Sequence, residues 1–416
     1  MKTKSIQSIK GTQDILPGEV HFWQAMERKI FEEMALFGFS EIRTPAFENT
    51  DLFSRSVGEQ TDIVSKEMYT FEDRSGGSLT LKPEATASVV RAFIQHNLDK
   101  INTITRLFYI DALFRRERPQ KGRYRQFHQF GAELFGSEHP EADVEIISLA
   151  SSIFKSIGIN EITLKINTIG SKSARDNYRI ELKKFLKPHF NKLSEASRER
   201  FEKNPLRILD SKNEIDIEIS KNAPSIQDYV SDELKGHHKK IKDSLNLLGI
   251  KFIENSSLVR GLDYYCSTVF EFKTDNLGSQ DTILGGGRYD GLVSILGGPD
   301  IPGIGWAAGV ERISLLMQNN TNDVAKVHIA VTDREFTNHL LKLMQYLNFN
   351  KISYYWNYKF NLKKSLSKAN KLKVSKVIII GENENKGNFF TVKDLQTGEQ
   401  NELNLNQLDK YFDDKN

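Results

Sequence analysis

Residues 106–136 read RLFYIDALFRRERPQKGRYRQFHQFGAELFG, two strand-like runs separated by a loop rich in arginine. The loop holds one acid, Glu117, and six basic residues: Arg115, Arg116, Arg118, Lys121, Arg123 and Arg125. Guanidinium groups bind phosphates and carboxylates through paired hydrogen bonds. The stretch therefore predicts two strands whose connecting loop binds a triphosphate or the end of a nucleic acid.

The second run predicts a strand with one polar, partly aromatic face. Side chains two positions apart along a strand point to the same side. The residues of that face are Phe127, Gln129, Gly131 and Glu133. A ring, an amide and a carboxylate beneath a cluster of guanidinium groups can hold something phosphorylated together with something zwitterionic, such as ATP beside an amino acid.

Length and composition predict a protein of several domains. The 416 residues are too many for one ordinary core, so we expect two or three domains. Hydrophobic residues make up 38%, and no apolar run reaches the length of about 18 residues that a membrane span needs. The N-terminal stretch MKTKSIQSIKGTQDILPG lacks an apolar signal core, so we expect a cytoplasmic protein.

Cysteine and histidine usage gives no sign of a metal centre. A single cysteine, Cys266, excludes an intramolecular disulfide and a multi-cysteine zinc site. The adjacent His237 and His238 lack the i, i+4 spacing of helical metal ligands. We expect these two histidines on a solvated, lysine-rich turn.

The net charge is only +3, so a nucleic acid would have to be met by local basic patches. One patch, residues 351–376, contains eight lysines and no acid, interleaved with Tyr354, Tyr355, Trp356, Tyr358 and Phe360. Lysines neutralise phosphates, and exposed rings stack on unpaired bases. Two interpretations stay open here: an RNA-binding surface, or a lysine-rich surface over a buried aromatic core.

Before residue 256 the chain alternates between strand-like and helical patterns. Apolar residues three and four apart predict a helix over 19–37 that ends at Gly38. Further helices are expected to begin near Ala85 and to run from 141 to 158. Residues 171–255 are rich in Lys, Glu, Ser and Asn with helical periodicity, which predicts a helical insertion.

Strand-like sequence returns after this insertion. SLVRGLDYYCSTVFEF (257–272) predicts a strand that carries Arg260, and LGGGRYDGL (284–292) predicts a glycine hairpin. Residues 303–317 begin as a glycine-rich strand and become a helix around Val310. A polar linker, 318–326, precedes alternating strands and helices that predict a small α/β domain.

Arg115, at the end of the first strand, and Arg260 are the candidate catalytic residues. The chain has no GxxxxGK[ST] loop, and GGGRYDG departs from GxGxxG, so arginines would have to hold ATP. A carboxylate that attacks the α-phosphate of ATP is already ionised at neutral pH, so no general base is needed. The reaction needs positioning, and neutralisation of the charge that builds on phosphorus.

Other polar residues suit an amino-acid pocket: Glu84, Thr86, Gln129, Glu133, Tyr264 and Tyr265. Carboxylates hold an ammonium group, and a carboxylate with a phenol can bracket the two nitrogens of an imidazole. Tyrosines in a predicted strand are more often core residues, so that alternative stays open.

Together the motifs resemble those of the histidyl-tRNA synthetases, a family of class II aminoacyl-tRNA synthetases. Three stretches resemble the signatures of the class: FGFSEIRTPAFE (37–48), FRRERPQKGRYRQFHQFGAE (114–133) and GIGWAAGVERI (303–313). Two more resemble segments particular to the histidine enzymes: LVRGLDYYCSTVFEF (258–272) and GGGRYDGL (285–292). The likeness runs from Ile9 to Gln400, essentially the whole chain.

This resemblance implies an α+β catalytic domain, an antiparallel sheet flanked by helices, in two parts (1–170 and 256–320). A helical insertion (171–255) interrupts it, and a C-terminal α/β domain (325–416) binds the anticodon. The implied activity is that of a histidine--tRNA ligase. L-histidine and ATP, with Mg²⁺, give histidyl-adenylate and pyrophosphate, and histidine then moves to the 3′ end of tRNA(His). A cytoplasmic homodimer is implied as well.

The resemblance also implies residue roles. Arg115 would contact the α-phosphate and the histidine carboxylate, and Arg260 would lie across the α-phosphate as the catalytic residue peculiar to the family. Histidine would be bound by Glu84, Ala85, Thr86, Arg115, Gln129, Glu133, Arg260, Tyr264, Tyr265 and Tyr289, with Glu133 and Tyr265 bracketing the imidazole. ATP would be bound by Arg115, Arg123, Phe127 under the adenine, and Arg312.

Two other functions compete with this one. A catalytically inactive, histidine-sensing regulatory subunit of ATP phosphoribosyltransferase shares the resemblance, but such subunits lack the anticodon domain and tend to lose the motif arginines. A pure RNA-binding module built on residues 351–376 leaves the amino-acid pocket unexplained.

Overall fold

The computed structural model describes residues 5–58, 61–120, 122–317 and 327–413. The chain forms two compact units, Met1–Asn319 and Asn320–Asn416, which are described separately. The expected linker, 318–326, lies outside the described residues. The limits expected for the catalytic parts and the insertion remain predictions.

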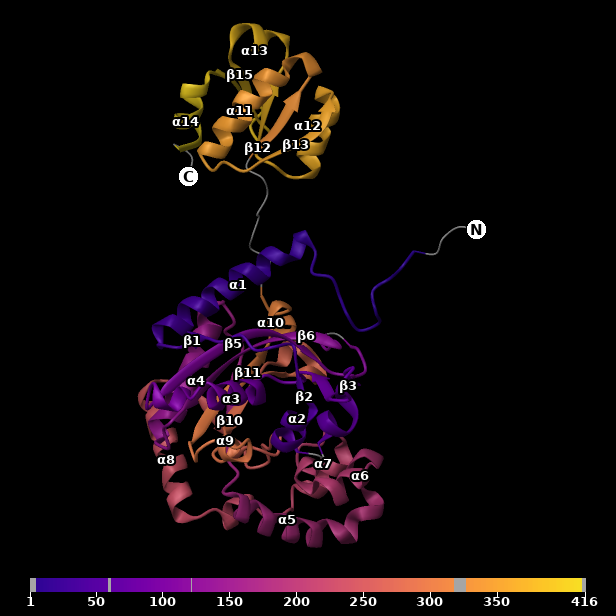
Figure 1. The fold of residues 1–416 in the computed structure, drawn as a ribbon, viewed down its shortest axis with the longest axis vertical. Helices are drawn as coiled ribbons and strands as arrows, with labels where there is room; N and C mark the ends of the chain where they lie inside the picture. Colours follow the sequence, from indigo (N-terminus) through magenta and orange to yellow (C-terminus); the bar gives the residue numbers. More distant parts are fainter. Residues whose placement is uncertain (1–4, 59–60, 121, 318–326, 414–416) are drawn as a thin grey trace. The chain divides into compact units, whose positions relative to one another are not determined.

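An eight-stranded sheet forms the centre of the first unit (Figure 1), in the order β1-β5-β6-β11-β10-β9-β7-β8. The strands are β1 (Ser40–Glu41), β5 (Thr105–Phe114), β6 (Gln126–Phe135), β7 (Thr163–Thr168), β8 (Phe252–Glu254), β9 (Cys266–Lys273), β10 (Thr282–Arg288) and β11 (Gly303–Gly309). Only the outermost pairs, β1 with β5 and β7 with β8, are parallel. The predicted sheet is therefore confirmed as mainly antiparallel.

Strands β5 and β6 are the two runs around the arginine loop, and they pair along their whole length from Thr105↔Phe135 to Phe114↔Gln126. Just beyond this ladder, Arg115 N–H donates to Arg125 O at 2.8 Å. The hairpin thus places Arg115 directly at the end of a regular strand.

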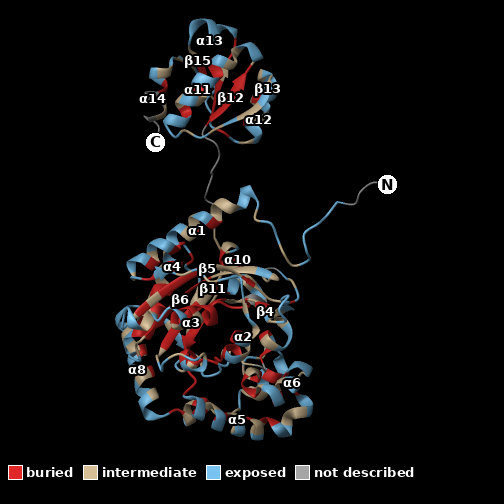
Figure 2. Cartoon of the chain, in the orientation of Figure 1, coloured by how far each residue is buried: buried red, intermediate tan, exposed pale blue. Residues whose placement is uncertain are grey.

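Two hydrophobic cores cover the two faces of the sheet, and buried residues follow the strands and the inner sides of the helices (Figure 2). One core contains helices α1 (Pro17–Leu36) and α4 (Pro140–Ser156). In α1 the buried residues recur at helical spacing: Trp23, Met26, Ile30 and Met34. The other core contains α3 (Thr86–Gln95) and includes Tyr264, Tyr265 and Tyr289.

A small three-stranded sheet, β2-β4-β3, precedes α3 in the chain. Its strands are β2 (Phe47–Asn49), β3 (Tyr69–Glu72) and β4 (Ser78–Leu81). Helix α2 (Thr50–Val57) and a π-helical turn, Ile63–Glu67, lie between β2 and β3 in the sequence. This region brings the KPEAT segment, residues 82–86, to the end of β4.

The predicted insertion contains the helices α5 (Lys172–Leu186), α6 (Glu195–Lys203), α7 (Glu214–Ser220) and α8 (Asp232–Leu247). In Figure 1, α5, α6 and α7 lie at the opposite end of this unit from α1. Helix α8 packs against α4, and β8 returns to pair with β7 at the edge of the large sheet. We call residues 172–247 the helical segment. Its C-terminal end leads into β8, which connects it to the large sheet.

The expectation for the two histidines is wrong. His237 and His238 lie within α8, and only 15% and 5% of their side chains are exposed. His237 Nε2 lies 3.3 Å from Asp143 Oδ2 in α4, and His238 Nε2 lies 3.0 Å from Glu254 Oε1. Their partners are distant in sequence, so the local lysine-rich context gave no sign of them.

Two expectations about the second half of the catalytic region are also wrong. Residues 258–265, which include Arg260, Tyr264 and Tyr265, form a loop, and the strand begins only at Cys266. The loop backbone bonds to groups other than a strand backbone: Leu258 O accepts from the Asn167 side chain of β7, and Asp263 N–H donates to Val57 O at the end of α2. Gly285, Gly286 and Gly287 of LGGGRYDGL lie inside β10 and not in a hairpin turn, and Gly291 lies in a turn after the strand.

The second unit is built on a five-stranded sheet in the order β13-β12-β14-β15-β16. Its strands are β12 (Val327–Val331), β13 (Tyr354–Phe360), β14 (Lys376–Ile380), β15 (Phe390–Asp394) and β16 (Gln400–Leu403), with helices α11 (Thr337–Phe349), α12 (Leu362–Lys371), α13 (Glu382–Gly387) and α14 (Leu405–Asp413). Parallel pairing of β12 with β13 and β14 agrees with the predicted α/β domain.

The aromatic and basic patch of residues 351–376 has both exposed and buried members, and RNA binding by it stays a prediction. Tyr355 and Tyr358 are exposed, the latter to 74%, whereas Trp356 and Phe360 pack on the core of this unit. Lys376 is buried, with its ammonium 5.2 Å from the centre of the Phe412 ring.

Among the described helices, none is both long and apolar enough to pass through a bilayer.

Candidate active site

A cavity of about 880 Å³ opens on the α3 side of the large sheet. Of the predicted site residues, eleven line it: Glu84, Ala85, Thr86, Arg115, Arg123, Phe127, Gln129, Arg260, Tyr264, Tyr265 and Arg312. Glu133 and Tyr289 are fully buried behind its wall. Lys121 of the arginine loop lies outside the described residues.

Arg115 and Arg260 reach this cavity from different segments. Arg115 Nε donates to Pro83 O at 2.8 Å, and its guanidinium lies 5.2 Å from the centre of the Phe127 ring. Arg260 Nη1 donates to Glu271 Oε2 at 3.4 Å, while its Nε has no hydrogen-bond partner among the residues described. Burial lowers the pKa of Arg115, Glu67 and Glu84 oppose this, and the charge of Arg260 lowers it further. The guanidinium groups of Arg115 and Arg260 therefore line the same cavity.

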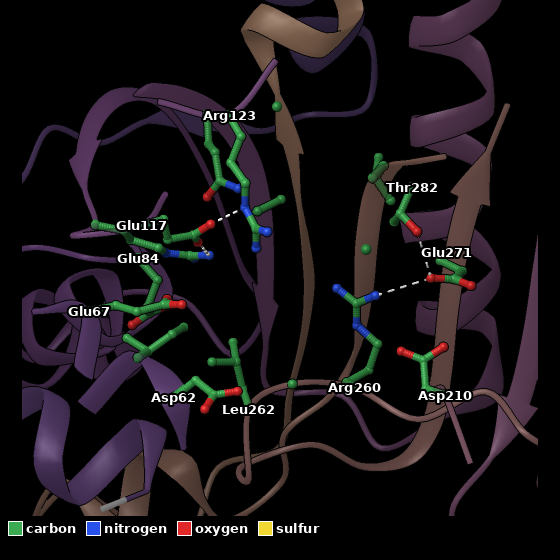
Figure 3. Close-up of a pocket in the computed structure, with 18 of the residues that line it drawn as sticks. Asp62, Glu67, Glu84, Glu117, Arg123, Asp210, Arg260, Leu262, Glu271 and Thr282 are labelled. Carbon is green, nitrogen blue, oxygen red and sulfur yellow. Dashed lines mark hydrogen bonds and ion pairs between the residues drawn. The ribbon is translucent and has the colours of Figure 1, made fainter. Parts of the chain in front are cut away.

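Figure 3 shows the two sides of the cavity. Glu84, Glu117 and Arg123 lie on one side, and Arg260, Asp210 and Glu271 lie on the other. Glu117 pairs with Arg123, and its Oε1 is 3.8 Å from Arg115 Nη1. Glu271 Oε2 also accepts from Thr282 Oγ1 at 3.1 Å, and its Oε1 pairs with Lys273 at 2.9 Å.

Arg312 extends the cluster of cations on the arginine-loop side. Its Nη1 donates to Thr282 O at 2.7 Å, and its Nε donates to Gly122 O at 3.3 Å. Burial lowers the pKa of Arg312 to about 10, and the charges of Arg123 and Arg115 add to this lowering. Cations that destabilise one another's charge in this way would be relieved by an anionic ligand such as a polyphosphate.

Glu84 lies at the start of α3, where its carboxylate accepts from Thr86 N–H and Ala87 N–H, both at 2.9 Å. These bonds satisfy two of the free N–H groups at the start of the helix and fix the carboxylate. Burial raises the pKa of Glu84, and these N–H bonds and the charge of Arg115 oppose the rise. Tyr264 O–H is 3.5 Å from Glu84 Oε2, so the loop before β9 also reaches this group.

Glu133 is the most deeply buried acid of the predicted site. Its Oε1 accepts from Thr86 Oγ1 at 2.7 Å, and its Oε2 accepts from Tyr289 O–H at 2.6 Å. A Cβ at Gly305 would lie 1.7 Å from Glu133 Oε2, so only glycine leaves room for the carboxylate there. Burial raises the pKa of Glu133 to about 8, against the lowering effect of the two hydroxyl bonds.

The predicted strand face is confirmed in part by this arrangement. Phe127 and Gln129 line the cavity, and Glu133 lies on the same side of β6 but deeper in the protein. Tyr265, whose pKa burial raises to about 12, is a neutral phenol at the cavity wall. The alternative of core tyrosines is also correct in part, because Tyr264 and Tyr265 are each only 6% exposed.

Several lining residues were not predicted. Tyr109, in β5, was identifiable from strand parity, because it faces Gly131 across the β5–β6 ladder. Asp62 and Glu67, from the stretch before β3, and Arg207 and Asp210, from the helical segment, also line the cavity. No local pattern marks these four, because only the tertiary fold brings them to the site.

Comparisons with known proteins agree with the motifs. Residues 11–313 match the family model of histidyl-tRNA synthetase, and residues 326–415 match that of the anticodon binding domain. A histidine--tRNA ligase of Caldanaerobacter subterraneus subsp. tengcongensis is 42% identical over 407 residues, 96% of this chain and 98% of the relative. One of Rippkaea orientalis is 44% identical over 408 residues, 97% of this chain and 95% of the relative. The chain belongs to the histidyl-tRNA synthetase family.

Solved structures of this family share the fold. The apo histidyl-tRNA synthetase of S. aureus matches with a TM-score of 0.79 at 34% identity, over 98% of this chain and 100% of that chain. A Bacillus halodurans protein described as an ATP phosphoribosyltransferase regulatory subunit/histidyl-tRNA synthetase shares the fold at 22% identity, with a TM-score of 0.68. The histidyl-tRNA synthetase family, the class II fold and the aminoacyl-tRNA ligase class are thus confirmed, and the regulatory alternative is not favoured.

Proposed function

We propose that this synthetase joins L-histidine to tRNA(His) in two steps within the cavity described above. The observation that carries the proposal is the convergence of Arg115 and Arg260 on one cavity, with the polar groups of Glu84, Thr86 and Gln129 beside them. In the first step a histidine carboxylate oxygen bonds to the α-phosphorus of ATP, and the bond from that phosphorus to the pyrophosphate oxygen breaks. In the second, the terminal ribose hydroxyl of the tRNA attacks the carbonyl carbon of the adenylate and AMP leaves.

Arg115 and Arg260 are assigned the α-phosphate, with Arg115 also bound to the histidine carboxylate. The nucleophile is ionised, so the protein's contribution is to hold it in line and to neutralise charge on the phosphoryl oxygens. Two guanidinium groups from separate segments fit this task because each offers a fork of N–H donors. Arg123 and Arg312 are assigned the outer phosphates, and Phe127 the adenine ring.

The amino-acid end of the cavity is assigned to histidine. Glu84, Thr86 and Gln129 hold the α-ammonium, with the Ala85 backbone beside them, while Glu133 and Tyr265 bracket the imidazole. Tyr264 and Tyr289 complete this pocket. Both oxygens of Glu133 already accept a hydroxyl bond, but a carboxylate has about four acceptor positions. The two hydroxyls can thus orient Glu133 while it accepts an imidazole N–H.

Mg²⁺ is proposed to enter bound to the triphosphate and not to occupy a site built from protein side chains alone. Within the described ranges, no group of three or more Asp, Glu, His or Cys side chains is placed to hold a metal ion. Glu271, beside Arg260, is already engaged with Thr282 and Lys273. Mg²⁺ is commonly bound by substrate phosphates and waters together with only one or two protein carboxylates, which suits this site.

The remaining assignments concern partners and location. The second unit is assigned the anticodon of tRNA(His), supported by the domain match and by exposed Tyr355 and Tyr358 among lysines. A homodimer and a cytoplasmic location follow from the family resemblance and stay predictions.

An ATP–pyrophosphate exchange assay over a panel of amino acids tests the proposal. Histidine alone should support exchange, and purified tRNA(His) should then accept histidine. Exchange with another amino acid, or none with histidine, would contradict the proposal.

A further inference from the structure

Arg288, the last residue of β10, is a buried cation whose donors are all used. It is 1% exposed, and its Nε and Nη2 donate to Asp143 Oδ2 at 2.8 and 2.6 Å. Nη1 donates to Ser137 O at 2.9 Å, and Nη2 also donates to His139 O at 2.9 Å. Arg288 therefore ties β10 to Asp143 in the first turn of α4 and to the loop that leads into that helix.

A buried ion pair of this kind is poor at adding stability, because removing two charges from water offsets most of their attraction. Its effect is geometric, since the fork of a guanidinium fixes both distance and direction. The role of the pair therefore depends on which residues it holds in place.

Arg288 is followed by Tyr289, whose O–H donates to Glu133 at 2.6 Å. Both sides of this tyrosine are tied down: Tyr289 N–H donates to Gly303 O at 2.8 Å, and Asp290 Oδ1 accepts from Gly303 N–H at 3.1 Å and from Arg288 Nη1 at 3.4 Å. The ring lies against Gly303, where a Cβ would be 2.3 Å from its Cε2. A displacement of Arg288 would therefore move the Tyr289 hydroxyl, which orients Glu133.

The same aspartate receives a third group from the helical segment. His237 Nε2 of α8 lies 3.3 Å from Asp143 Oδ2, and 15% of the His237 side chain is exposed. Asp143 is fully buried, and its Oδ1 has no hydrogen-bond partner among the described residues. Helix α8 is thus connected to Glu133 through Asp143, Arg288 and Tyr289.

We propose that Asp143 and Arg288 are positioning residues for the histidine pocket: they set the place of Tyr289, and through it that of Glu133, and His237 joins the helical segment to this pair. The inference rests on the proposed function, in which Glu133 binds the imidazole. Its consequence is that the affinity for histidine depends on a contact between α4 and α8 that lies outside the cavity.

Helix α4 offers a control, because a second arginine also pairs with one of its carboxylates, at a partly exposed position. Arg106 Nε and Nη2 donate to Glu145 Oε1 and Oε2 at 2.5 and 3.0 Å. That pair joins α4 to β5 and does not hold the turn of Tyr289. Glu145→Gln therefore reproduces the loss of a paired carboxylate on α4 without the proposed link to the pocket.

The test is steady-state ATP–pyrophosphate exchange with the full chain carrying Asp143→Asn, with its melting temperature recorded. A displacement of the pocket floor should raise KM for histidine about tenfold, whereas KM for ATP should change less than about twofold. Glu145→Gln should leave both constants near those of the unmodified protein. His237→Gln, at a partly exposed position, should give a smaller rise in KM for histidine and keeps the test available if Asp143→Asn fails to fold.

A double-mutant cycle decides whether the effect passes through Tyr289. In a Tyr289→Phe background, Asp143→Asn should add less than about twofold to KM for histidine, since the link is already broken. Full additivity, equal rises in KM for ATP and histidine, an equal effect of Glu145→Gln, or unchanged KM in both His237→Gln and Asp143→Asn would overturn the inference. If the unmodified protein fails to activate histidine, the proposed function fails instead.

Discussion

Arg115 and Arg260 reach one cavity from segments of opposite character. Arg115 follows the last residue of β5 in a ladder that pairs at every step from Thr105 to Phe114. Arg260 lies in a loop, residues 258–265, whose backbone bonds to the Asn167 side chain and to the end of helix α2. The position of Arg115 is fixed by a regular strand, whereas that of Arg260 depends on the side chains and backbone around its loop. Arg260 should therefore be easier to displace than Arg115.

The largest effect is expected from removing the loop-borne guanidinium. Arg260→His should lower the rate of adenylate formation about a thousandfold, because one of the two cations facing the α-phosphate is absent. The affinity for tRNA should stay nearly unchanged. Single-turnover measurement of adenylate formation and a tRNA filter-binding assay check both parts, and full exchange activity in this variant would refute the role of Arg260.

Displacing Arg260 without removing it sharpens the comparison. A Cβ at Gly285, inside β10, would lie 1.9 Å from Arg260 Nη2. Gly285→Ala should therefore push the guanidinium aside and lower kcat about a hundredfold, as expected for a displacement of about 1 Å. Gly236→Ala, where no atom lies within 4 Å of the new Cβ, is the control. Equal kcat values for the two variants would show that Arg260 need not stay where the loop places it.

Glu133, in strand β6, should affect the pH dependence of the free energy of unfolding as well as the binding of histidine. Its pKa is about 8 in the folded protein against 4.5 for an ordinary glutamate, so the folded state binds this proton more tightly than the unfolded chain. Stability from this group is complete below about pH 4.5, is lost as the pH rises to about 8, and then stays lost. Glutamine does not titrate. Because each pH unit between the two pKa values corresponds to about 1.4 kcal/mol, Glu133→Gln should gain a few kcal/mol over the unmodified protein across this range.

Thermal melts of Glu133→Gln and the unmodified protein from pH 4 to 9 check this prediction. Above about pH 8, where Glu133 is ionised, the same variant should raise KM for histidine about a hundredfold, the effect expected from removing one hydrogen bond to a charged group. A melting-temperature difference that does not change with pH would mean that Glu133 is ionised in the folded state without cost.

The smallest effect on activation should come from the second unit. Lys359, Lys363 and Lys364 are exposed, and replacing all three with serine should weaken tRNA binding. The steepness of log K against log salt should fall by about 0.7 for each phosphate of the unpaired strand that a lysine no longer neutralises. Pyrophosphate exchange should be unaffected, and Lys386→Ser on α13 serves as the control. If exchange falls too, these lysines are needed for folding.

The same comparison explains how much of the molecule could be predicted. Strand parity placed Phe127, Gln129 and Glu133 on one face because β6 is regular, and periodic apolar residues located α1 for the same reason. The loop at 258–265 resembles a strand in sequence because its apolar residues are buried, but tertiary contacts and not sheet pairing bury them. The contact of His237 with Asp143 spans 94 residues, and no local pattern announces a partner at that distance.

The central claim, that Arg115 and Arg260 act on one phosphate, is tested most directly by a crystal structure with a stable analogue of histidyl-adenylate. The account predicts both guanidinium groups within about 2.7 to 3.1 Å of oxygens on the same phosphate, and Glu133 bound to the imidazole. A structure in which Arg260 stays on Glu271 and leaves the phosphate to Arg115 alone would contradict it.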